Sequence, residues 1–168
     1  LTFTRKASQE MLSRAAFYSD DRCKKVSGGT FHSFANQILR RYGDIIGYSK
    51  NFNIIDETDA TEIIHRVREE FNIKNTKTRF PKKETLQNIF SKSVNTGIKI
   101  NDILAEEYPQ FVNLSEKVHS IFEQYNLYKK QKSLMDYDDL LINLLTILKD
   151  HQEIRQRLNA QYKYVMVD

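Results

Sequence analysis

Two strand-to-helix steps follow one another at the start of the chain, and they restrict the possible folds more than any other feature. Residues 1–4 (LTFT) alternate as a short buried strand does, and residues 5–18 repeat apolar side chains every three to four positions, as a helix does. Residues 25–29 (KVSGG) predict a second short strand, and residues 31–42 predict a helix that ends at Gly43. Strand, helix, strand and helix in this order are typical of a parallel α/β sheet.

Helices dominate after Gly43, and a strand pattern returns only at the end of the chain. A short extended piece (FNII, 52–55) comes first. The helices predicted after it are residues 57–71 with Asp56 as cap, one that begins at Pro81 and closes near Gly97, a short one capped by Asn101, residues 114–131, a buried helix within 134–151, and residues 152–161. Residues 163–167 (KYVMV) predict a strand. The expected fold is therefore a helix-dominated α/β fold, in which an all-helical insertion interrupts a partial parallel sheet.

The composition excludes several classes of protein. Cys23 is the only cysteine in the chain, which excludes a disulfide framework within it, and no Cys/His spacing resembles a metal site. No apolar run approaches the roughly 18 residues of a membrane span. We therefore expect a cytoplasmic protein without a membrane segment. Because the chain opens and closes in strand patterns, we also expect it to be a piece of a longer protein.

Positive charge is unevenly distributed. The net charge is +4, and residues 72–100 carry seven Lys/Arg side chains against one acid, Glu84. A basic stretch favours binding of a polyanion through the release of counterions. The alternative is a solvated helix face with no partner, and the sequence leaves both interpretations open.

Two short motifs near the start have an ordinary and a functional interpretation. LTFT is a buried strand, or a strand whose end faces a ligand, where Phe3 stacks on a base and Arg5 meets phosphate. TFHS is a helix start capped by Thr30 or Ser33, or a place where Thr30, His32, Ser33 and the free helix amides bind phosphate oxygens.

Two acidic motifs lie near the other end of the chain. DYDD (136–139) is an acidic helix start, which the helix dipole favours, and a metal-binding or catalytic role is the weaker interpretation. VMVD is a strand pattern that ends at Asp168, the position of a magnesium-ligating aspartate in phosphate-handling α/β proteins.

Five segments stand in a fixed order along nearly the whole chain: LTFTRKASQEM, GTFHSFANQILRRYG, NFNIIDETDATEII, LMDYDDLLINLLTIL and YKYVMVD. In sequence and spacing they resemble the amino-terminal half of UvrD/Rep/PcrA-type superfamily 1 DNA helicases. The first resembles motif Ia, with Arg5 where asparagine is commonest and Ser8 where alanine is common. GTFHSF resembles motif Ib, MDYDDLL resembles the LDFDDLL segment with Tyr137 in place of phenylalanine, and YVMVD resembles the first part of motif II.

The resemblance implies an activity for the parent protein. That parent would be a motor driven by ATP and Mg²⁺, which moves 3′ to 5′ along single-stranded DNA and separates the duplex. The family's phosphate-binding loop, GxxxxGK[ST], does not occur in this sequence, and Asp168 stands one residue before the position of the glutamate that activates water. We therefore expect this chain alone to bind no cofactor and hydrolyse no ATP.

The resemblance also assigns sites and subdomains. Phe3 and Arg5 match positions that face single-stranded DNA, and Thr30, His32 and Ser33 match positions that touch its backbone. Asp168 matches the magnesium ligand. Residues 1–43 and 131–168 would form a partial RecA-like lobe, subdomain 1A, and residues 44–130 the helical subdomain 1B.

The expected partners are single-stranded DNA and junctions of single-stranded with duplex DNA. An incomplete sheet would also leave edges able to pair between molecules. Two alternatives remain open: a helicase-nuclease subunit with the same motifs, and a non-enzymatic helical module that binds nucleic acid or protein. The pathway, whether DNA repair, replication restart or plasmid replication, also stays open.

Overall fold

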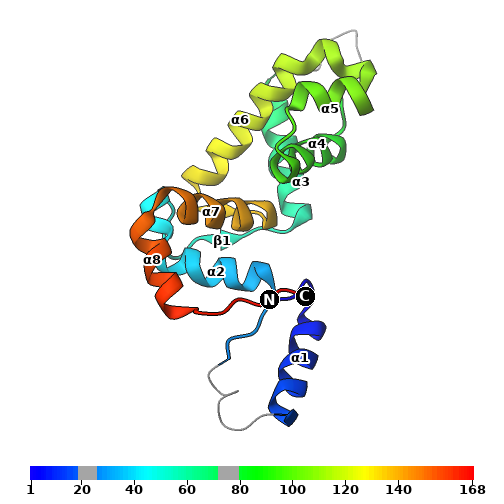
Figure 1. The fold of residues 1–168 in the computed structure, drawn as a ribbon. Helices are drawn as coiled ribbons and strands as arrows, with labels where there is room; N and C mark the ends of the chain where they lie inside the picture. The colour runs from blue at the N-terminus through cyan, green and yellow to red at the C-terminus, as the bar shows by residue number, and fades with distance from the viewer. Residues whose placement is uncertain (19–25, 72–79) are drawn as a thin grey trace.

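A computed structural model describes residues 1–18, 26–71 and 80–168 of the chain. Its helices are α1 (Arg5–Tyr18), α2 (Phe31–Tyr42), α3 (Glu57–Glu70), α4 (Lys83–Thr96), α5 (Ile100–Glu107), α6 (Ser115–Gln131), α7 (Tyr137–Asp150) and α8 (Gln152–Gln161), with 3₁₀ turns η2 (Gly43–Ile46) and η4 (Pro109–Leu114). The strands are β1 (Asn53–Ile54) and β2 (Leu134–Met135). The predicted helix-dominated α/β class is confirmed (Figure 1).

The two strands join the parts of the chain that lie before and after the helical middle. They pair in parallel, with Asn53 opposite Leu134 and Ile54 opposite Met135. Each strand leads directly into a helix whose cap is an aspartate: Asp56 accepts from the amide of Asp59 at 2.9 Å, and Asp136 caps α7 in the same way. The predicted extended piece at FNII and its Asp56 cap are therefore confirmed.

Three other segments were expected to be strands, and this expectation is wrong in detail. Residues 1–4 and 26–30 meet only at an isolated parallel bridge between Thr2 and Thr30. The ammonium of Leu1 donates to the carbonyl of Met166 at 2.6 Å, and the amide of Asp168 donates to the carbonyl of Leu1 at 3.1 Å. The two ends of the chain thus lie side by side in Figure 1, aligned in parallel, but residues 163–167 form no strand. One or two paired residues per segment are too few to make a stable ladder.

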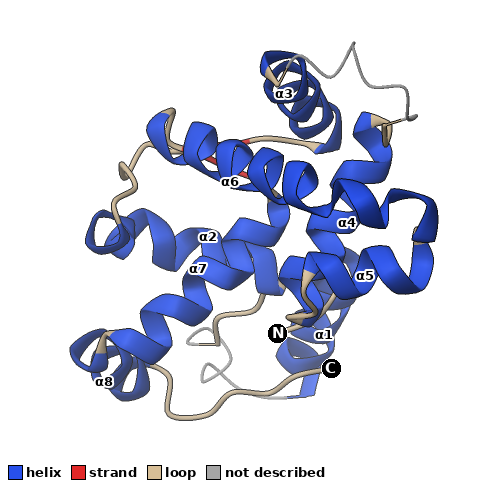
Figure 2. Ribbon diagram, turned by 90° about the horizontal axis from the view of Figure 1, so that it is seen from above, coloured by secondary structure: helices blue, strands red, loops and turns tan. Residues whose placement is uncertain are grey.

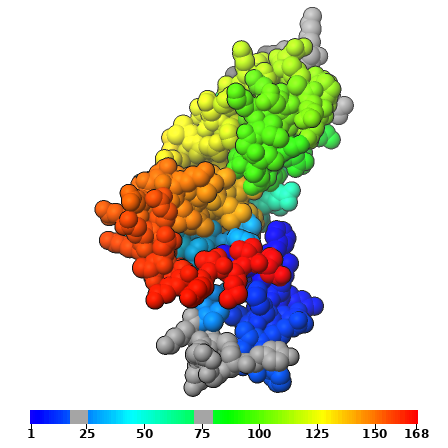
Figure 3. Space-filling view, viewed as in Figure 1, coloured from blue at the N-terminus to red at the C-terminus, as the bar shows by residue number. Residues whose placement is uncertain are grey.

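The described residues form two separate hydrophobic cores. In Figure 3 the helical middle of the chain, in green and yellow, forms the upper part of the molecule, and α7 and α8, in orange, lie below it. The first, which we call the helical cluster, is built by α3, α4, α5 and α6; its buried members are Ile55, Ala60, Ile64, Val67, Leu86, Ile89, Phe90, Ile100, Ile103, Leu104, Leu114, Val118, Ile121 and Tyr125. The second, the α2–α7–α8 cluster, contains Ala35, Ile38, Leu39, Tyr48, Phe52, Met135, Leu140, Ile147, Ile154 and Leu158. Helices α2 and α7 lie side by side within it (Figure 2).

Helix α1 stands apart from both cores. None of its apolar side chains belongs to either set of buried core residues, and Phe17 is 83% exposed. Thr4 lies just before the helix. Its side-chain oxygen accepts a hydrogen bond from the amide of Ala7, and its carbonyl oxygen accepts one from the amide of Ser8. Local capping therefore explains where α1 starts, and among the described residues its apolar side chains join neither set of buried core residues.

Two boundary predictions and one prediction of burial need correction. Pro81 lies before the α4 cap, Lys82, and not in the first turn. Lys99, not Asn101, occupies the cap position of α5. Helix α7 was expected to be buried, yet Ile142 is 36% and Leu145 44% exposed, because α2 and α8 cover only part of a helix that is apolar around most of its circumference.

Candidate nucleic-acid interface

The start of α2 is a capped helix N-terminus. Thr30 has extended backbone angles, and its hydroxyl oxygen accepts from the amide of Ser33 at 3.2 Å. The hydroxyls of Thr30 and Ser33 also lie 2.9 Å apart. Thr30 is buried and Ser33 is exposed. The prediction that Thr30 caps this helix is therefore confirmed, and the first turn carries no acidic side chain that would repel an anion.

Phe3 and Arg5 follow Thr2, which pairs with Thr30 in the isolated parallel bridge at this helix start. Thr2 is buried in the bridge with Thr30, so the residues that follow each of them emerge at the same end. Phe3 comes directly after Thr2 and is 83% exposed. Arg5 is the first residue of α1 and is exposed. The bridge therefore brings Phe3 and Arg5 to the same edge as the start of α2.

His32 lies next to a residue that the sequence did not single out as a site. Its ring meets the ring of Tyr137 edge to face, with centroids 5.8 Å apart and planes at 85°. Tyr137 is the first residue of α7. The GTFHSF and MDYDDLL segments, which are far apart in sequence, therefore meet through two aromatic side chains.

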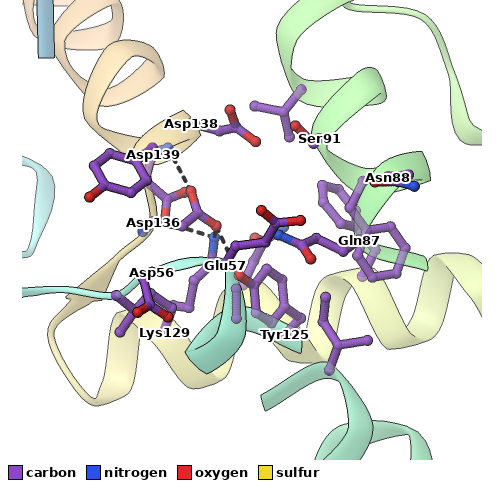
Figure 4. A pocket seen from close by; sticks show the side chains of 18 residues that line it. Asp56, Glu57, Gln87, Asn88, Ser91, Tyr125, Lys129, Asp136, Asp138 and Asp139 are labelled. Carbon is purple, nitrogen blue, oxygen red and sulfur yellow. Dashed lines mark hydrogen bonds and ion pairs between the residues drawn. The ribbon is translucent and has the colours of Figure 1, made fainter. Parts of the chain in front are cut away.

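The other side chains of the DYDD segment point toward the helical cluster. Lys129 of α6 donates to Asp136 at 2.6 Å and to Asp139 at 2.7 Å, and the hydroxyl of Tyr125 donates to Asp136 at 2.9 Å (Figure 4). Asp136 and Asp139 also form a capping box at the start of α7. The side chain of Lys129 is only 3% exposed. This group of four residues, which we call the ion-pair junction, ties α6 to α7.

Burial and a single ammonium give the two carboxyls different acidities. Burial opposes ionisation of Asp136, but the charge and hydrogen bond of Lys129 outweigh it and hold the pKa of Asp136 below its ordinary value. For Asp139, burial together with the neighbouring charge of Asp136 exceeds the effect of Lys129, and its pKa rises to about 6. Burial also raises the pKa of Tyr125, so its hydroxyl stays a donor. The ammonium of Lys129 thus offsets the cost of burying a charge at Asp136 but not at Asp139.

A pocket of about 260 Å³ opens beside the junction, between α3, α4, α6 and the start of α7. Asp56, Glu57 and Asp138 also line it (Figure 4). Asp138 accepts from the side-chain amide of Asn95 on α4 at 2.8 Å. Within the described ranges, no group of three or more His, Cys, Asp and Glu side chains could hold a metal ion. The acids of DYDD therefore act as helix caps and links between elements.

Asp168 lies apart from these acids. It is exposed, and its backbone amide bonds to Leu1. The sequence contains no GxxxxGK[ST] loop, and no other acid of the described part of the chain joins Asp168 in a metal-binding group.

The basic stretch at 72–100 divides into three parts. Residues 72–79, with three of its basic side chains, lie outside the described residues. Lys83 pairs with Glu62, and Lys92 pairs with Glu107. Lys82 and Lys99 are exposed at the starts of α4 and α5. Two of the four described lysines are thus neutralised locally, which favours the solvated-face interpretation for them.

Sequence reasoning missed Lys129 and Tyr137. Lys129 follows Val118, Ile121 and Tyr125 at helical spacing, so it falls on the apolar stripe of α6, and a lysine in that register indicates a buried partner. Tyr137 had no comparable signal, because its contact with His32 depends on how α7 packs against α2.

Among the described residues, no helix combines the length and the apolar character needed to cross a membrane.

Comparison with known proteins assigns the chain to a family. The sequence profile of the UvrD/REP helicase N-terminal domain matches residues 1–168, and the chain belongs to that family. It is 31% identical over 169 residues to the ATP-dependent DNA helicase PcrA of Leuconostoc citreum. It is 28% identical over 168 residues to proteins of the same name from Staphylococcus epidermidis and Staphylococcus aureus. All of this chain is covered in each comparison but only 22% of the relative, so the chain spans about a fifth of their length.

Proposed function

We propose that this chain is the DNA-contacting part of an ATP-dependent 3′–5′ DNA helicase that unwinds duplex DNA. The observation that carries the proposal is the parallel bridge, which leaves the exposed Phe3 and Arg5 beside the start of α2. The relatives that match the whole chain are named ATP-dependent DNA helicases. A helicase needs a surface that follows a single strand without reading its sequence, and aromatic stacking next to basic and amide groups provides one.

In this proposal each candidate residue has a physical role. Phe3 stacks on a base, and Arg5 pairs with a phosphate. Thr30 holds the first turn of α2 in place, while His32, Ser33 and the amides of that turn approach the sugar-phosphate backbone. The roles of Phe3 and Thr30 are supported by their opposite environments, since Phe3 is exposed and Thr30 is buried in its cap.

The two cores support the proposed subdomains. Residues 1–43 and 131–168 would belong to a partial RecA-like lobe, and residues 44–130 to a helical subdomain 1B that lies over the DNA. Tyr48 and Phe52 pack with the α2–α7–α8 cluster, and Ile55 packs with the helical cluster. This packing favours boundaries at β1 (Asn53–Ile54) and β2 (Leu134–Met135) in place of the boundaries at 43/44 and 130/131 inferred from sequence.

The chemistry of ATP would belong to the whole protein. ATP and Mg²⁺ would supply phosphoryl transfer there, with Asp168 as one magnesium ligand, and the 168 residues alone would hydrolyse no ATP. We further propose a cytoplasmic protein that acts at junctions of single-stranded with duplex DNA in a process such as DNA repair. The exposed end of the chain, where Tyr164 is 87% exposed, would allow copies of the chain to associate by pairing of their segments.

Binding of fluorescently labelled oligothymidine, measured by anisotropy, tests the DNA contacts. We expect affinity to fall steeply between about 50 and 200 mM salt, as it does for phosphate contacts. Phe3→Ala should weaken binding about fivefold to tenfold, as expected for one stacked base. Phe17→Ala is the matched control, because both phenylalanines are 83% exposed but Phe17 lies at the far end of α1. Affinity that does not depend on salt, or equal losses in the two variants, would contradict the proposal.

ATP hydrolysis separates the helicase from the alternatives. The full-length parent should hydrolyse ATP, and single-stranded DNA should stimulate it. A parent with no hydrolysis would favour the non-enzymatic helical module, and a parent that also degrades DNA would favour the helicase-nuclease subunit. Hydrolysis by the 168-residue chain alone would contradict the view that this part lacks the nucleotide site.

A further inference from the structure

Two basic segments meet near the end of α2 that is far from the candidate DNA contacts. Residues 40–53 and 130–135 carry five Lys/Arg side chains against one acid, Asp44. The amide of Asn53 donates to the carbonyl of Ser133 at 2.9 Å, so the two segments lie side by side. Helix α2 has 12 residues and is therefore about 18 Å long. In Figure 1 its far end lies on the left, away from the chain ends marked N and C.

Contacts within and between the two segments bring four of these cations together. Arg40 donates to two backbone carbonyls of residues 50–52, at 3.0 and 2.9 Å. Gly47 turns the chain with φ = 86°, and a β-carbon placed on it would lie 3.2 Å from Cε and 3.6 Å from Nζ of Lys130. The ammonium of Lys130 therefore lies against this turn, and Lys132 follows two residues later. We call this group the basic surface; its members are Arg40, Lys50, Lys130 and Lys132.

The charge of the basic surface is not cancelled by its neighbours. Its three lysines are exposed, and within the described ranges none of them pairs with an acid. Arg40 bonds only to neutral carbonyls. By contrast, the lysines of α4 and of the ion-pair junction face carboxylates. Neighbouring cations without acidic partners attract a polyanion, because its binding releases counterions.

The aromatic residues of the 47–53 segment are buried beneath these cations. Tyr48 is 9% exposed and Phe52 is fully buried, and the guanidinium of Arg40 lies 4.2 Å from the centre of the Phe52 ring. Sites that bind single strands without sequence preference combine cations with rings on which bases stack. The 47–53 segment offers no such ring. It therefore suits the outside of a duplex, where phosphates are accessible and the bases are already stacked on each other.

We infer that the basic surface binds the phosphate backbone of duplex DNA, at a place distinct from the strand contacts at the start of α2. The proposed function gives none of these four residues a role, so the inference goes beyond it. Phosphate contacts position DNA without reading its sequence. Since one helix carries the strand contacts at its start and the basic surface near its end, a junction bound at both would be held at points about 18 Å apart.

The salt dependence of duplex binding tests the inference. A short labelled duplex and labelled oligothymidine are each titrated with the chain at several salt concentrations. Lys132→Gln should make the slope of log affinity against log salt less negative by about 1 for the duplex, because one phosphate contact is lost. The slope for oligothymidine should not change. Lys130→Gln should act in the same way as Lys132→Gln.

Lys117→Gln is the matched control, because Lys117 is exposed on the same helix, α6, but at its other end. It should leave both slopes unchanged. The three lysines are exposed and face no acid, so all three variants should keep the melting temperature of the unaltered chain.

The outcomes separate this inference from the proposed function. Unchanged duplex slopes in Lys130→Gln and Lys132→Gln, or an equal change in Lys117→Gln, would overturn it. Equal changes for duplex and oligothymidine would also overturn it, because the basic surface would then be part of the strand site. If the unaltered chain binds oligothymidine but no duplex, the inference is wrong and the proposed strand contacts stand. If it binds the duplex as expected and Phe3→Ala has no effect on oligothymidine, the strand contacts are wrong and the basic surface stands.

Discussion

The helical cluster and the α2–α7–α8 cluster differ in how completely each covers its apolar residues. In the described parts of 55–134, the exposed large hydrophobic side chains are Ile98, Val112 and Leu127, none more than 46% exposed. Around the other cluster, Leu145 is 44% exposed and Val165 and Met166 are 66% and 76% exposed. Few exposed apolar side chains thus accompany the helical cluster, whereas more strongly exposed ones lie on α7 and near the end of the chain, outside the second cluster.

The difference follows from how each core is assembled. Helices α3 to α6 follow one another closely, so each buries its apolar face against a neighbour in sequence. The α2–α7–α8 cluster joins residues 35–52 with residues 135–162. The strand patterns beside it meet through one isolated bridge and through two backbone hydrogen bonds at Leu1. A core built from sequence neighbours can be complete in a short stretch, whereas a sheet needs several partner strands.

The ion-pair junction links the two clusters, so a substitution there should have the largest effect on stability. Lys129→Met would leave Asp136 and Asp139 buried without their ammonium, and we expect a loss of about 3–5 kcal/mol in the free energy of unfolding. Urea denaturation followed by circular dichroism measures it. Lys83→Met, which removes an ion pair with a far more exposed acid, is the control and should change stability far less than Lys129→Met does. Similar small losses in both variants would show that the junction does not hold the clusters together.

Packing gives the second largest contrast. Ile121 is fully buried in the helical cluster, and Ile121→Ala should cost about 2–5 kcal/mol because it leaves a cavity. Leu145 lies on the uncovered side of α7, and Leu145→Ala should change stability by about 0.5 kcal/mol or less. Thermal unfolding of the two variants side by side provides the measurement. A large loss for Leu145→Ala would mean that this face of α7 is covered in solution, for example by a second copy of the chain.

The sequence predicted most helices and their caps because these depend on local patterns. The Asp56 cap and the start of α2 at Thr30 are examples, since a side-chain oxygen that bonds to a nearby amide needs no distant partner. The strand at 163–167 was wrong because pairing depends on segments that lie elsewhere in the chain. The contact between His32 and Tyr137 could not be predicted for a related reason: it exists only once α2 and α7 have packed.

The pH dependence of stability should also distinguish the junction from the cores. The pKa of Asp139 is raised to about 6, chiefly by burial and then by Asp136, against the opposing effect of Lys129. A carboxyl whose pKa is higher in the folded than in the unfolded state stabilises the fold below its unfolded pKa and loses that contribution as pH rises through the folded value. Asp139 should therefore destabilise the fold progressively between about pH 4 and 6, relative to the protonated group.

Asp139→Asn isolates this contribution. Asparagine keeps an oxygen that can accept from the amide of Asp136 but cannot ionise. The difference in unfolding free energy between the variant and the unaltered chain, measured from pH 4 to 7, should grow in favour of the variant as pH rises. A difference that is constant across this range would mean that the pKa of Asp139 is not raised in the folded state.

The smallest expected effect comes from replacing two glycines that end helices: Gly97 at the end of α4, beside the helical cluster, and Gly43 at the end of α2, beside the α2–α7–α8 cluster. Gly97 ends α4 with φ = 73°, in the left-handed region that side chains rarely adopt, and no atom lies within 4 Å of a β-carbon placed there. Gly43 ends α2 with φ = −63°, and its β-carbon would meet only ordinary contacts with Tyr48, at 3.8 and 3.9 Å. Gly97→Ala should therefore cost about 1 kcal/mol from backbone strain alone, and Gly43→Ala should cost less or stabilise the chain. The sequence pattern of the two glycines is the same, so denaturation of the two alanine variants measures what only the backbone conformation distinguishes. Equal costs would mean that the two helices end in the same conformation, contrary to the angles found here.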